Sequence, residues 1–362
     1  MFYVAVFILF SGLPKTEIIN GKTPETRQKE VITHNVSTGN LILGGVASII
    51  PGIIISGGGH YMTGDNTGAK KLFYAKATGL GILISGFLPI LFSNASEKVM
   101  FVAYPVALTG FGLFSISTLA DLFGTLNTGA KNSFSNKTPY TIQLEQNIMH
   151  VHDPQFNYDF FSYSSVFFNF RKTVSGIEGY YAPEDSNKKL KLSTSYILLG
   201  KAPSEFRNDN SKLEITVAWS WHKFPNELFS TQTYEISCGG RMELHHFHGS
   251  LKGSFSEISL GAALERVKYD FTPTDKDYSS LLLFRFSFGI YLGSNKNGEL
   301  EIFYNHRHDD WAAGLGAGGM GDGVLGHFGI QGHYFFNKLL GVRALFEAGM
   351  AYRTVLGMVI RY

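Results

Sequence analysis

Hydrophobic and polar side chains alternate through residues 340–362, at the end of the chain. Apolar residues occupy the even-numbered positions, with one threonine as an exception, and the odd-numbered positions carry Arg343, Glu347, Arg353 and Arg361. Because successive side chains of a β-strand point to opposite faces, the pattern predicts one apolar face and one charged face. Such an apolar face covers the core of a water-soluble sheet or contacts lipid in a transmembrane barrel.

The same alternation recurs from about Pro139 onward, and polar turns separate the alternating stretches. The clearest of these stretches are 213–221, 256–264 and 282–292. Their number and spacing predict about 10 to 12 strands, in the range of small membrane barrels. The predicted fold class is therefore mainly β, with a C-terminal antiparallel transmembrane β-barrel over residues 133–362. A soluble β-sandwich, in which two sheets bury these faces against each other, is the alternative.

The chain ends on an aromatic residue, Tyr362, with Leu356, Met358 and Ile360 at the alternate positions before it. This ending resembles the C-terminal signal by which bacterial outer-membrane β-barrels are recognised for assembly. The resemblance implies the bacterial outer membrane as the location of the protein. It also implies outer-membrane lipid, including lipopolysaccharide, and the barrel-assembly machinery as partners, beside a possible envelope protein.

Three glycine-rich apolar blocks precede the β-pattern, at 41–59, 72–93 and 99–124. Each block approaches the ~20 residues that a helix needs to cross a bilayer. Glycines let such helices approach each other closely. We therefore predict a small apolar helical hairpin domain over residues 39–126, in front of the barrel.

The first residues of the chain form a short apolar run. Residues 1–13 have the length of the hydrophobic region of a signal sequence and are too short to span a bilayer. We expect a signal sequence there, with a buried strand as the alternative. Residues 14–38 are polar and lack periodicity, so we expect a linker.

A dense motif lies between the first two apolar blocks: Pro51, Gly52, Gly59, His60, Tyr61, Gly64, Asp65 and Lys70. The motif resembles helical-hairpin membrane domains of the TM2-like type. It is more similar to a myxobacterial-type envelope family of unknown function that combines a Gly-His-aromatic-Gly-Asp motif with a C-terminal β-region. Asp65 supplies N-cap chemistry for the next helix. His60 is either hydrogen-bonded within the hairpin or acts as a ligand or proton relay.

The strand pattern around residue 305 places His306 and His308 on one face, with Asp310 close behind. Two imidazoles at this spacing project in parallel from the outer rim of a barrel, an arrangement that suits metal binding or acid–base chemistry. The placement resembles the lipid A 3-O-deacylase family, whose members carry a His-x-Ser pair on a lipid-facing strand. His306 matches the histidine of that pair. His308 stands where the serine is expected, so the nucleophile is missing and we assign no catalytic residue.

A second histidine cluster ends another strand. His246 and His248 share a parity beside a Gly-Ser turn, and they are the candidate metal ligands of this segment. Solvated histidines at a loop tip are the alternative.

Composition excludes several function classes. A net charge of +2 without a basic run argues against a nucleic-acid partner. A single cysteine, Cys238, excludes an intrachain disulfide and a cysteine-based zinc site, and nothing indicates a cofactor. The predicted function is non-enzymatic: a structural or assembly component of the outer membrane, or a narrow channel. One alternative is a lipid A-modifying hydrolase with a His306/His308 site. Another is an inner-membrane helical protein with a soluble periplasmic β-domain.

Overall fold

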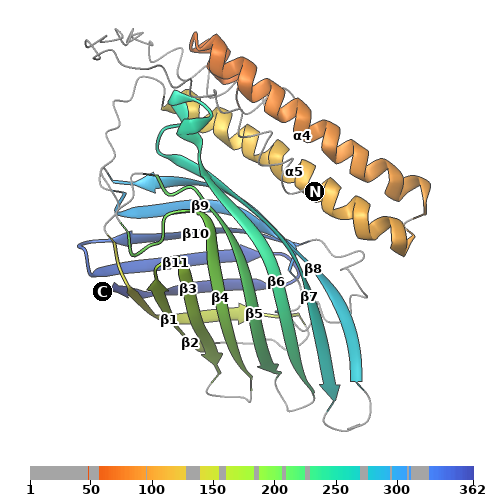
Figure 1. Cartoon of the computed structure of the whole chain (residues 1–362), viewed down its shortest axis with the longest axis vertical. Coiled ribbons are helices and arrows are strands. Elements are labelled where there is room, and N and C mark those ends of the chain that lie inside the picture. Colours follow the sequence, from red (N-terminus) through yellow and green to blue (C-terminus); the bar gives the residue numbers. More distant parts are fainter. Residues whose placement is uncertain are drawn as a thin grey trace, which may run out of the picture.

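The chain folds into a closed antiparallel barrel with a helical region on its outside (Figure 1). The computed structural model describes residues 48, 57–94, 96–127, 139–154, 160–182, 187–205, 209–224, 229–269, 276–293, 296–307, 310 and 326–362. The predicted signal sequence, the linker, Pro51 and Gly52 therefore lie outside the described residues.

Twelve strands form the barrel, and each pairs with its neighbours in sequence. They are β1 (Ile142–His152), β2 (Phe160–Phe170), β3 (Thr173–Tyr181), β4 (Lys188–Gly200), β5 (Lys212–Lys223), β6 (Phe229–Glu243), β7 (Ser254–Tyr269), β8 (Lys276–Leu292), β9 (Gly298–Asn305), β10 (His327–Phe335), β11 (Leu340–Ala348) and β12 (Tyr352–Arg361). The barrel closes where β1 pairs with β12. Closure confirms the predicted fold class and excludes the sandwich.

The terminal alternation belongs to two strands, because a turn at 349–351 separates β11 from β12 without changing the parity. The outward side chains of these strands are large, apolar and exposed: Leu340, Val342, Phe346, Tyr352, Leu356, Met358 and Tyr362. Arg343, Glu347 and Arg353 point inward instead and form ion pairs. An apolar outside around a polar inside is the arrangement of outer-membrane barrels. The predicted location in the bacterial outer membrane is confirmed.

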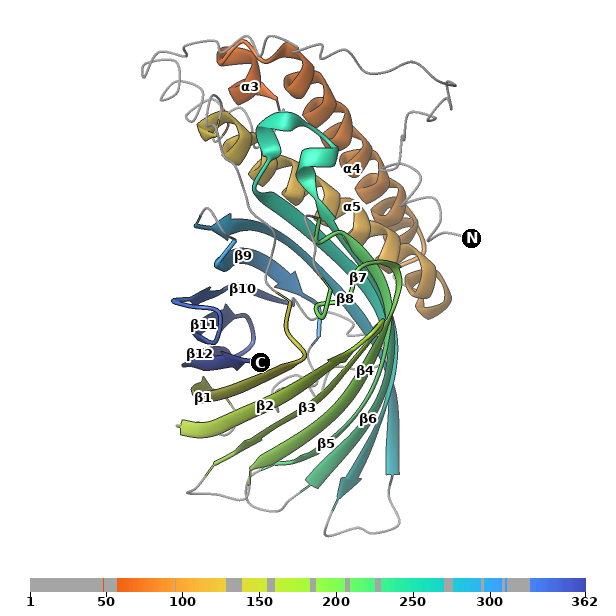
Figure 2. The ribbon, with the colours of Figure 1, turned by 60° about the vertical axis from the view of Figure 1, so that its left-hand side comes forward.

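The helical region contains α3 (Gly58–Met62), α4 (Asn66–Phe92) and α5 (Glu97–Leu126). Asp65 caps α4, because its Oδ1 accepts a hydrogen bond from Gly68 N at 2.9 Å. Helices α4 and α5 touch at backbone distance, since a Cβ on Gly86 would lie 2.4 Å from Ala107 N. By length and composition, both are apolar enough to cross a membrane. They lie side by side along the outside of β7 and β8 (Figure 2).

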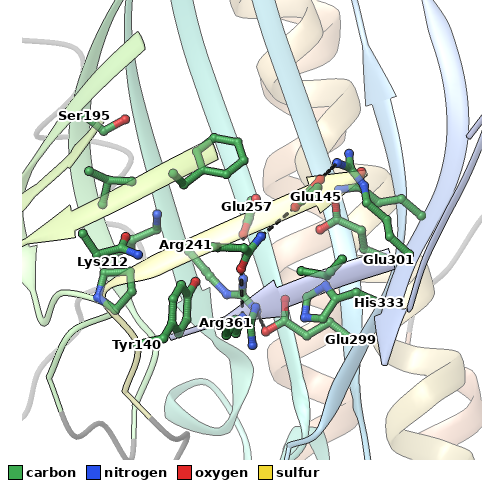
Figure 3. A pocket seen from close by; sticks show the side chains of 18 of the residues that line it. Tyr140, Glu145, Ser195, Lys212, Arg241, Glu257, Glu299, Glu301, His333 and Arg361 are labelled. Atoms are coloured by element: carbon green, nitrogen blue, oxygen red, sulfur yellow. Dashed lines mark hydrogen bonds and ion pairs between the residues drawn. The ribbon is translucent and has the colours of Figure 1, made fainter. Parts of the chain in front are cut away.

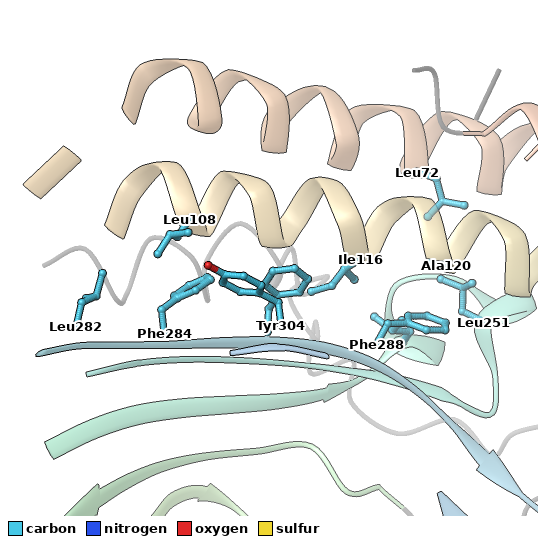
Figure 4. Close-up of a cluster of buried hydrophobic side chains, with 11 residues drawn as sticks. Leu72, Leu108, Ile116, Ala120, Leu251, Leu282, Phe284, Phe288 and Tyr304 are labelled. Atoms are coloured by element: carbon cyan, nitrogen blue, oxygen red, sulfur yellow. The ribbon is translucent and has the colours of Figure 1, made fainter. Parts of the chain in front are cut away.

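Helix α5 covers the most aromatic part of the barrel's outer face. Leu108, Ile116 and Ala120 of α5 are buried against side chains of β8 and β9 (Figure 4). The Phe111 ring meets Phe286 and Tyr304 edge to face, with centroids 5.5 and 5.9 Å away. Outward residues of the predicted strand 282–292 therefore contact a helix instead of lipid. In lipid, close packing rather than the hydrophobic effect stabilises such a contact.

The two ends of the barrel differ in their connections. The short β2–β3 and β10–β11 turns lie at the end that also carries the start of β1 and the C-terminus. The longest connection, between β9 and β10, leaves the opposite end. Long loops mark the extracellular end of outer-membrane barrels, so the β9–β10 connection assigns the end with the start of β1 and the C-terminus to the periplasm. The β6–β7 connection, with the 3-10 helices η2 (Leu244–His246) and η3 (Gly249–Leu251), lies at this same end.

We expect the purified full-length protein to be heat-modifiable. A closed barrel keeps its strand pairing in mild detergent and binds less dodecyl sulfate than the unfolded chain, so unboiled and boiled samples should migrate differently on a gel. A circular-dichroism spectrum recorded in parallel controls for folding. Identical migration of a sample with full β-structure would contradict a closed barrel.

Candidate functional site

The inside of the barrel is lined by ion pairs between neighbouring strands. Arg343 on β11 pairs with Glu145 on β1, and Arg285 on β8 pairs with Glu301 on β9. Arg285 also lies 3.2 Å from Glu257 on β7. These positions share the inward parity, and Figure 3 shows Glu145, Glu257 and Glu301 beside the same cavity. Strand alternation thus brings charges from β1, β7, β8, β9 and β11 into one layer.

Several cavities lie in the described part of the lumen, and two of them follow one another along the barrel. The one nearer the chain termini has a volume of about 380 Å³, and the one nearer the opposite end has a volume of about 270 Å³. Glu178, Gln331 and Arg343 line both cavities. We call the layer between the cavities the lumen belt, and it comprises Glu145, Glu178, Arg285, Glu301, Gln331 and Arg343. The belt thus separates the two cavities and contributes side chains to each of them.

Around the second cavity, cationic side chains outnumber carboxylates: the lining includes Lys189, Lys191, Arg285, Arg307, Arg343 and Arg353, together with Glu178 and Asp310. The side chain of Arg353 is 22% exposed, whereas its partner Glu347 is 2% exposed. Glu235 pairs with both Lys191 and Arg307, at 3.0 and 2.8 Å, and is itself buried. A solute in this cavity therefore meets a mainly cationic surface, part of whose charge is balanced by buried carboxylates.

Asp310, one of the predicted site residues, belongs to this cavity. It pairs with Lys189 and lies 3.3 Å from Arg307 Nε. Burial alone raises the pKa of the Asp310 carboxyl, but Lys189 and Arg307 outweigh burial and hold the pKa well below its usual range. Asp310 therefore stays an anion in an ion-pair network, remote from His306 on the outer face.

His306 points outward, as its parity predicts, but it does not form an open rim. Its side chain is fully buried, and the Tyr104 ring of α5 covers it at a centroid distance of 5.1 Å. His306 Nδ1 lies 3.0 Å from the Tyr304 hydroxyl. A helix therefore covers the outer-rim position that the sequence analysis gave to His306. His308 lies outside the described residues.

A second polar site lies where the helices meet the periplasmic end of the barrel. His60 of α3 is fully buried, and its Nδ1 lies 2.7 Å from Asp121 Oδ1 on α5. His60 Nε2 lies 2.9 Å from Ser250 Oγ in the β6–β7 connection. The histidine of the sequence motif thus joins the helical region to the barrel by side-chain hydrogen bonds.

His248 completes this site from the barrel side. Its Nδ1 lies 2.8 Å from Ser250 Oγ and 3.4 Å from Asp65 Oδ2. Burial lowers the pKa of His248, an effect that Asp65 opposes and that His60 and Lys71 reinforce. A neutral imidazole is the form that accepts protons or binds metals. We call His60, Asp65, Asp121, His248 and Ser250 the junction cluster.

The structure separates the predicted metal pair His246 and His248. His246 turns the other way and lies 2.7 Å from Asp209 Oδ2, with half of its side chain exposed. Because η2 lies between the strand end and His248, strand parity no longer applies to these residues. Nor can these histidines meet His306, since the two connections leave opposite ends of the barrel.

The other motif residues shape the turn around His60. Gly64 adopts the left-handed conformation with φ of +84°, between α3 and the cap of α4. Gly59 is buried, and Tyr61 and Lys70 are exposed. The sequence analysis missed Asp121 and Ser250. Asp121 is the one carboxylate in the apolar block 99–124, and an isolated charge in such a block is a signal of a functional residue.

The comparisons with known proteins show no family, and three similar solved structures have TM-scores below 0.5. Neither the models of known protein families nor the sequences of curated proteins match the chain. Among solved structures, Omp33 of Acinetobacter baumannii is 8% identical, with 62% of this chain and 98% of that chain covered and a TM-score of 0.33. The translocator domain of the autotransporter NalP from Neisseria meningitidis is 9% identical, with 68% of this chain and 98% of that chain covered and a TM-score of 0.39. Outer membrane phospholipase A from Escherichia coli is 10% identical, with 62% of this chain and 94% of that chain covered and a TM-score of 0.33.

We expect Glu145→Ala to destabilise the barrel. The substitution leaves the guanidinium of Arg343 without its ion-pair partner at the belt, and breaking a buried pair from one side costs about 3 kcal/mol. Urea titration of the protein folded in lipid vesicles measures the loss. The double variant Glu145→Met/Arg343→Met removes both charges and should recover most of the stability. Equal losses in the single and double variants would contradict this account of the pair.

Proposed function

We propose that the protein is an integral outer-membrane barrel that acts as a narrow, non-enzymatic channel for small polar solutes. The observation that carries the proposal is the pair of lumen cavities that meet at Glu178, Gln331 and Arg343. An interior of packed hydrophobic side chains would leave no such polar space. Barrels of this strand number are wide enough for a small solute but not for a broad aqueous pore.

The charges of the lumen support a selective path. At the belt, paired ionic side chains fill part of the lumen. Because their charges largely cancel, the belt has no strong net charge that would trap a solute. The second cavity is lined by more cations than carboxylates, and Lys191 and Arg353 are partly exposed there, whereas their partners Glu235 and Glu347 are buried. This excess favours small anions over cations on the side away from the chain termini.

The proposal includes the partners that the sequence implies. The exposed apolar outer face is suited to outer-membrane lipid, and the alternating end Leu356, Met358, Ile360 and Tyr362 is suited to recognition by the barrel-assembly machinery. The hydrolase alternative is less well supported, because Tyr104 covers His306 and a lipid cannot reach its imidazole. The soluble-domain alternative conflicts with the many large apolar side chains exposed around the barrel.

Conductance in planar lipid bilayers tests the proposal. We expect the full-length protein to give small single-channel steps and, under a salt gradient, a reversal potential of the sign for anion preference. The variant Glu145→Ser/Arg343→Ser removes both charges of one belt pair and shortens both side chains. It should therefore raise the single-channel conductance.

A matched control variant distinguishes an effect of the belt on conductance from a general loss of protein stability. Asp209→Ser/His246→Ser removes another ion pair, which lines neither cavity, and its conductance should equal that of the unmodified protein. The channel proposal fails if heat-modifiable protein inserts without conductance steps and the belt variant gives none either.

A further inference from the structure

We propose that His60, Asp65 and His248 of the junction cluster bind a divalent transition-metal ion of the zinc class, which fastens the helical region to the barrel. The site is independent of the lumen and of the proposed channel. Its three donor atoms are His60 Nε2, Asp65 Oδ2 and His248 Nδ1, and they come from α3, the cap of α4 and the β6–β7 connection.

The donor atoms are already close to the spacing that a metal requires. All three lie within 4.8 Å of one another. Asp65 Oδ2 is 3.4 Å from His248 Nδ1 and 4.0 Å from His60 Nε2. Ligand bonds of about 2.0–2.1 Å in a tetrahedral site place neighbouring donor atoms about 3.3 Å apart. The spacing between Asp65 Oδ2 and His248 Nδ1 already matches this value, and the spacing between Asp65 Oδ2 and His60 Nε2 would shorten by about 0.7 Å on binding. Two imidazoles and a carboxylate are a donor set typical of zinc.

Asp121 holds the His60 ring in the orientation that metal binding requires. Its carboxylate is fully buried, accepts a hydrogen bond from Gly57 N at 2.8 Å, and lies 2.7 Å from His60 Nδ1. When His60 donates the Nδ1 proton to this carboxylate, the Nε2 lone pair faces the cluster. A carboxylate behind a histidine in this way is the usual second partner of a metal-bound imidazole.

The protein encloses the His60 ring and leaves the other ligands accessible. A Cβ on Gly124 would lie 2.5 Å from His60 Nε2, and one on Gly68 would lie 2.7 Å from His60 Cδ2. Both positions therefore need glycine for the ring to fit between the helices. The side chains of Asp65 and His248 are 21% and 17% exposed, so an ion can enter from that side.

Ser250 suggests a rival reading of the same atoms. Asp121, His60 and Ser250 follow the order of a serine-hydrolase triad. Ser250 N donates to His248 Nδ1 at 3.3 Å, and this hydrogen bond would be replaced either by an oxyanion on Ser250 N in a triad or by a metal ion on His248 Nδ1. The two readings differ at Asp65, to which the triad gives no role. A metal uses every member of the cluster, with Ser250 Oγ as a fourth ligand or as a hydrogen-bond partner of a bound water.

Metal binding by the full-length protein in detergent tests the proposal. The protein is purified with a tag that contains no histidine, stripped with a chelator and titrated with Zn²⁺ or Co²⁺. We expect one ion per chain by elemental analysis and, for Co²⁺, the visible absorption of tetrahedral coordination. Asp121→Asn should weaken binding about 10- to 100-fold, and His248→Ala, which removes a ligand, should weaken it more.

The neighbouring histidine supplies the matched control. His246→Ala removes an imidazole two residues from His248 and should bind as tightly as the unmodified protein. All variants are first shown to be heat-modifiable, so that a folding defect is not read as a lost ligand. The proposal is overturned if folded protein binds no ion, or if His246→Ala weakens binding as much as His248→Ala. It is also overturned if a fluorophosphonate labels Ser250 in the chelator-treated protein and Zn²⁺ does not block the labelling.

Discussion

Closure of the strand ladder is the constraint on which the rest of this structure depends. A bilayer offers no water to an unpaired backbone N–H or C=O, so a sheet can cross it only when its first and last strands pair. Here β12 pairs with β1 over its full length, from His152 opposite Tyr352 to Gln143 opposite Arg361. Once the ladder closes, strand alternation assigns each strand side chain to the outer face or to the lumen.

That assignment explains why the interior is made of paired charges. Each strand must place every second residue inside, and several of those residues are arginines or glutamates. A charge in a confined space is tolerated when an opposite charge lies next to it. The pair of Arg343 on β11 and Glu145 on β1 reaches across β12. At the seam itself, Arg361 Nε donates to Oε1 of the opposed Gln143 at 2.8 Å, which helps to fix the register of β1 and β12. The polar cavities are what remains between these pairs.

The barrel could be predicted from the sequence because its signal is local. The alternation of apolar and polar residues in 282–292 and 340–362 directly predicts strands. Closure of the barrel then gives all strands the same apolar outer face and polar inner face. The covering of His306 could not be predicted, since nothing in its own strand shows that α5 lies over it. The junction cluster depends on contacts such as His60 with Ser250, which are 190 positions apart in the chain. Local patterns did single out His60, Asp65 and His248, and Asp121, a carboxylate within an apolar block, offered a local signal that the sequence analysis did not use.

The covering helix also has a consequence for the membrane around the protein. The 30 residues of α5 make a rod about 45 Å long, whereas the apolar band of an outer-membrane barrel is about 25 Å tall. A rod that follows strands tilted by about 40° still rises about 34 Å along the membrane normal. A helix that is longer than the apolar band tilts further, thickens the bilayer around it or extends beyond it. Because Asp121, through His60, and Asn127 of this segment are tied to the barrel at its periplasmic end, the helix keeps a fixed depth relative to the strands, and the surrounding lipid must adapt to its length.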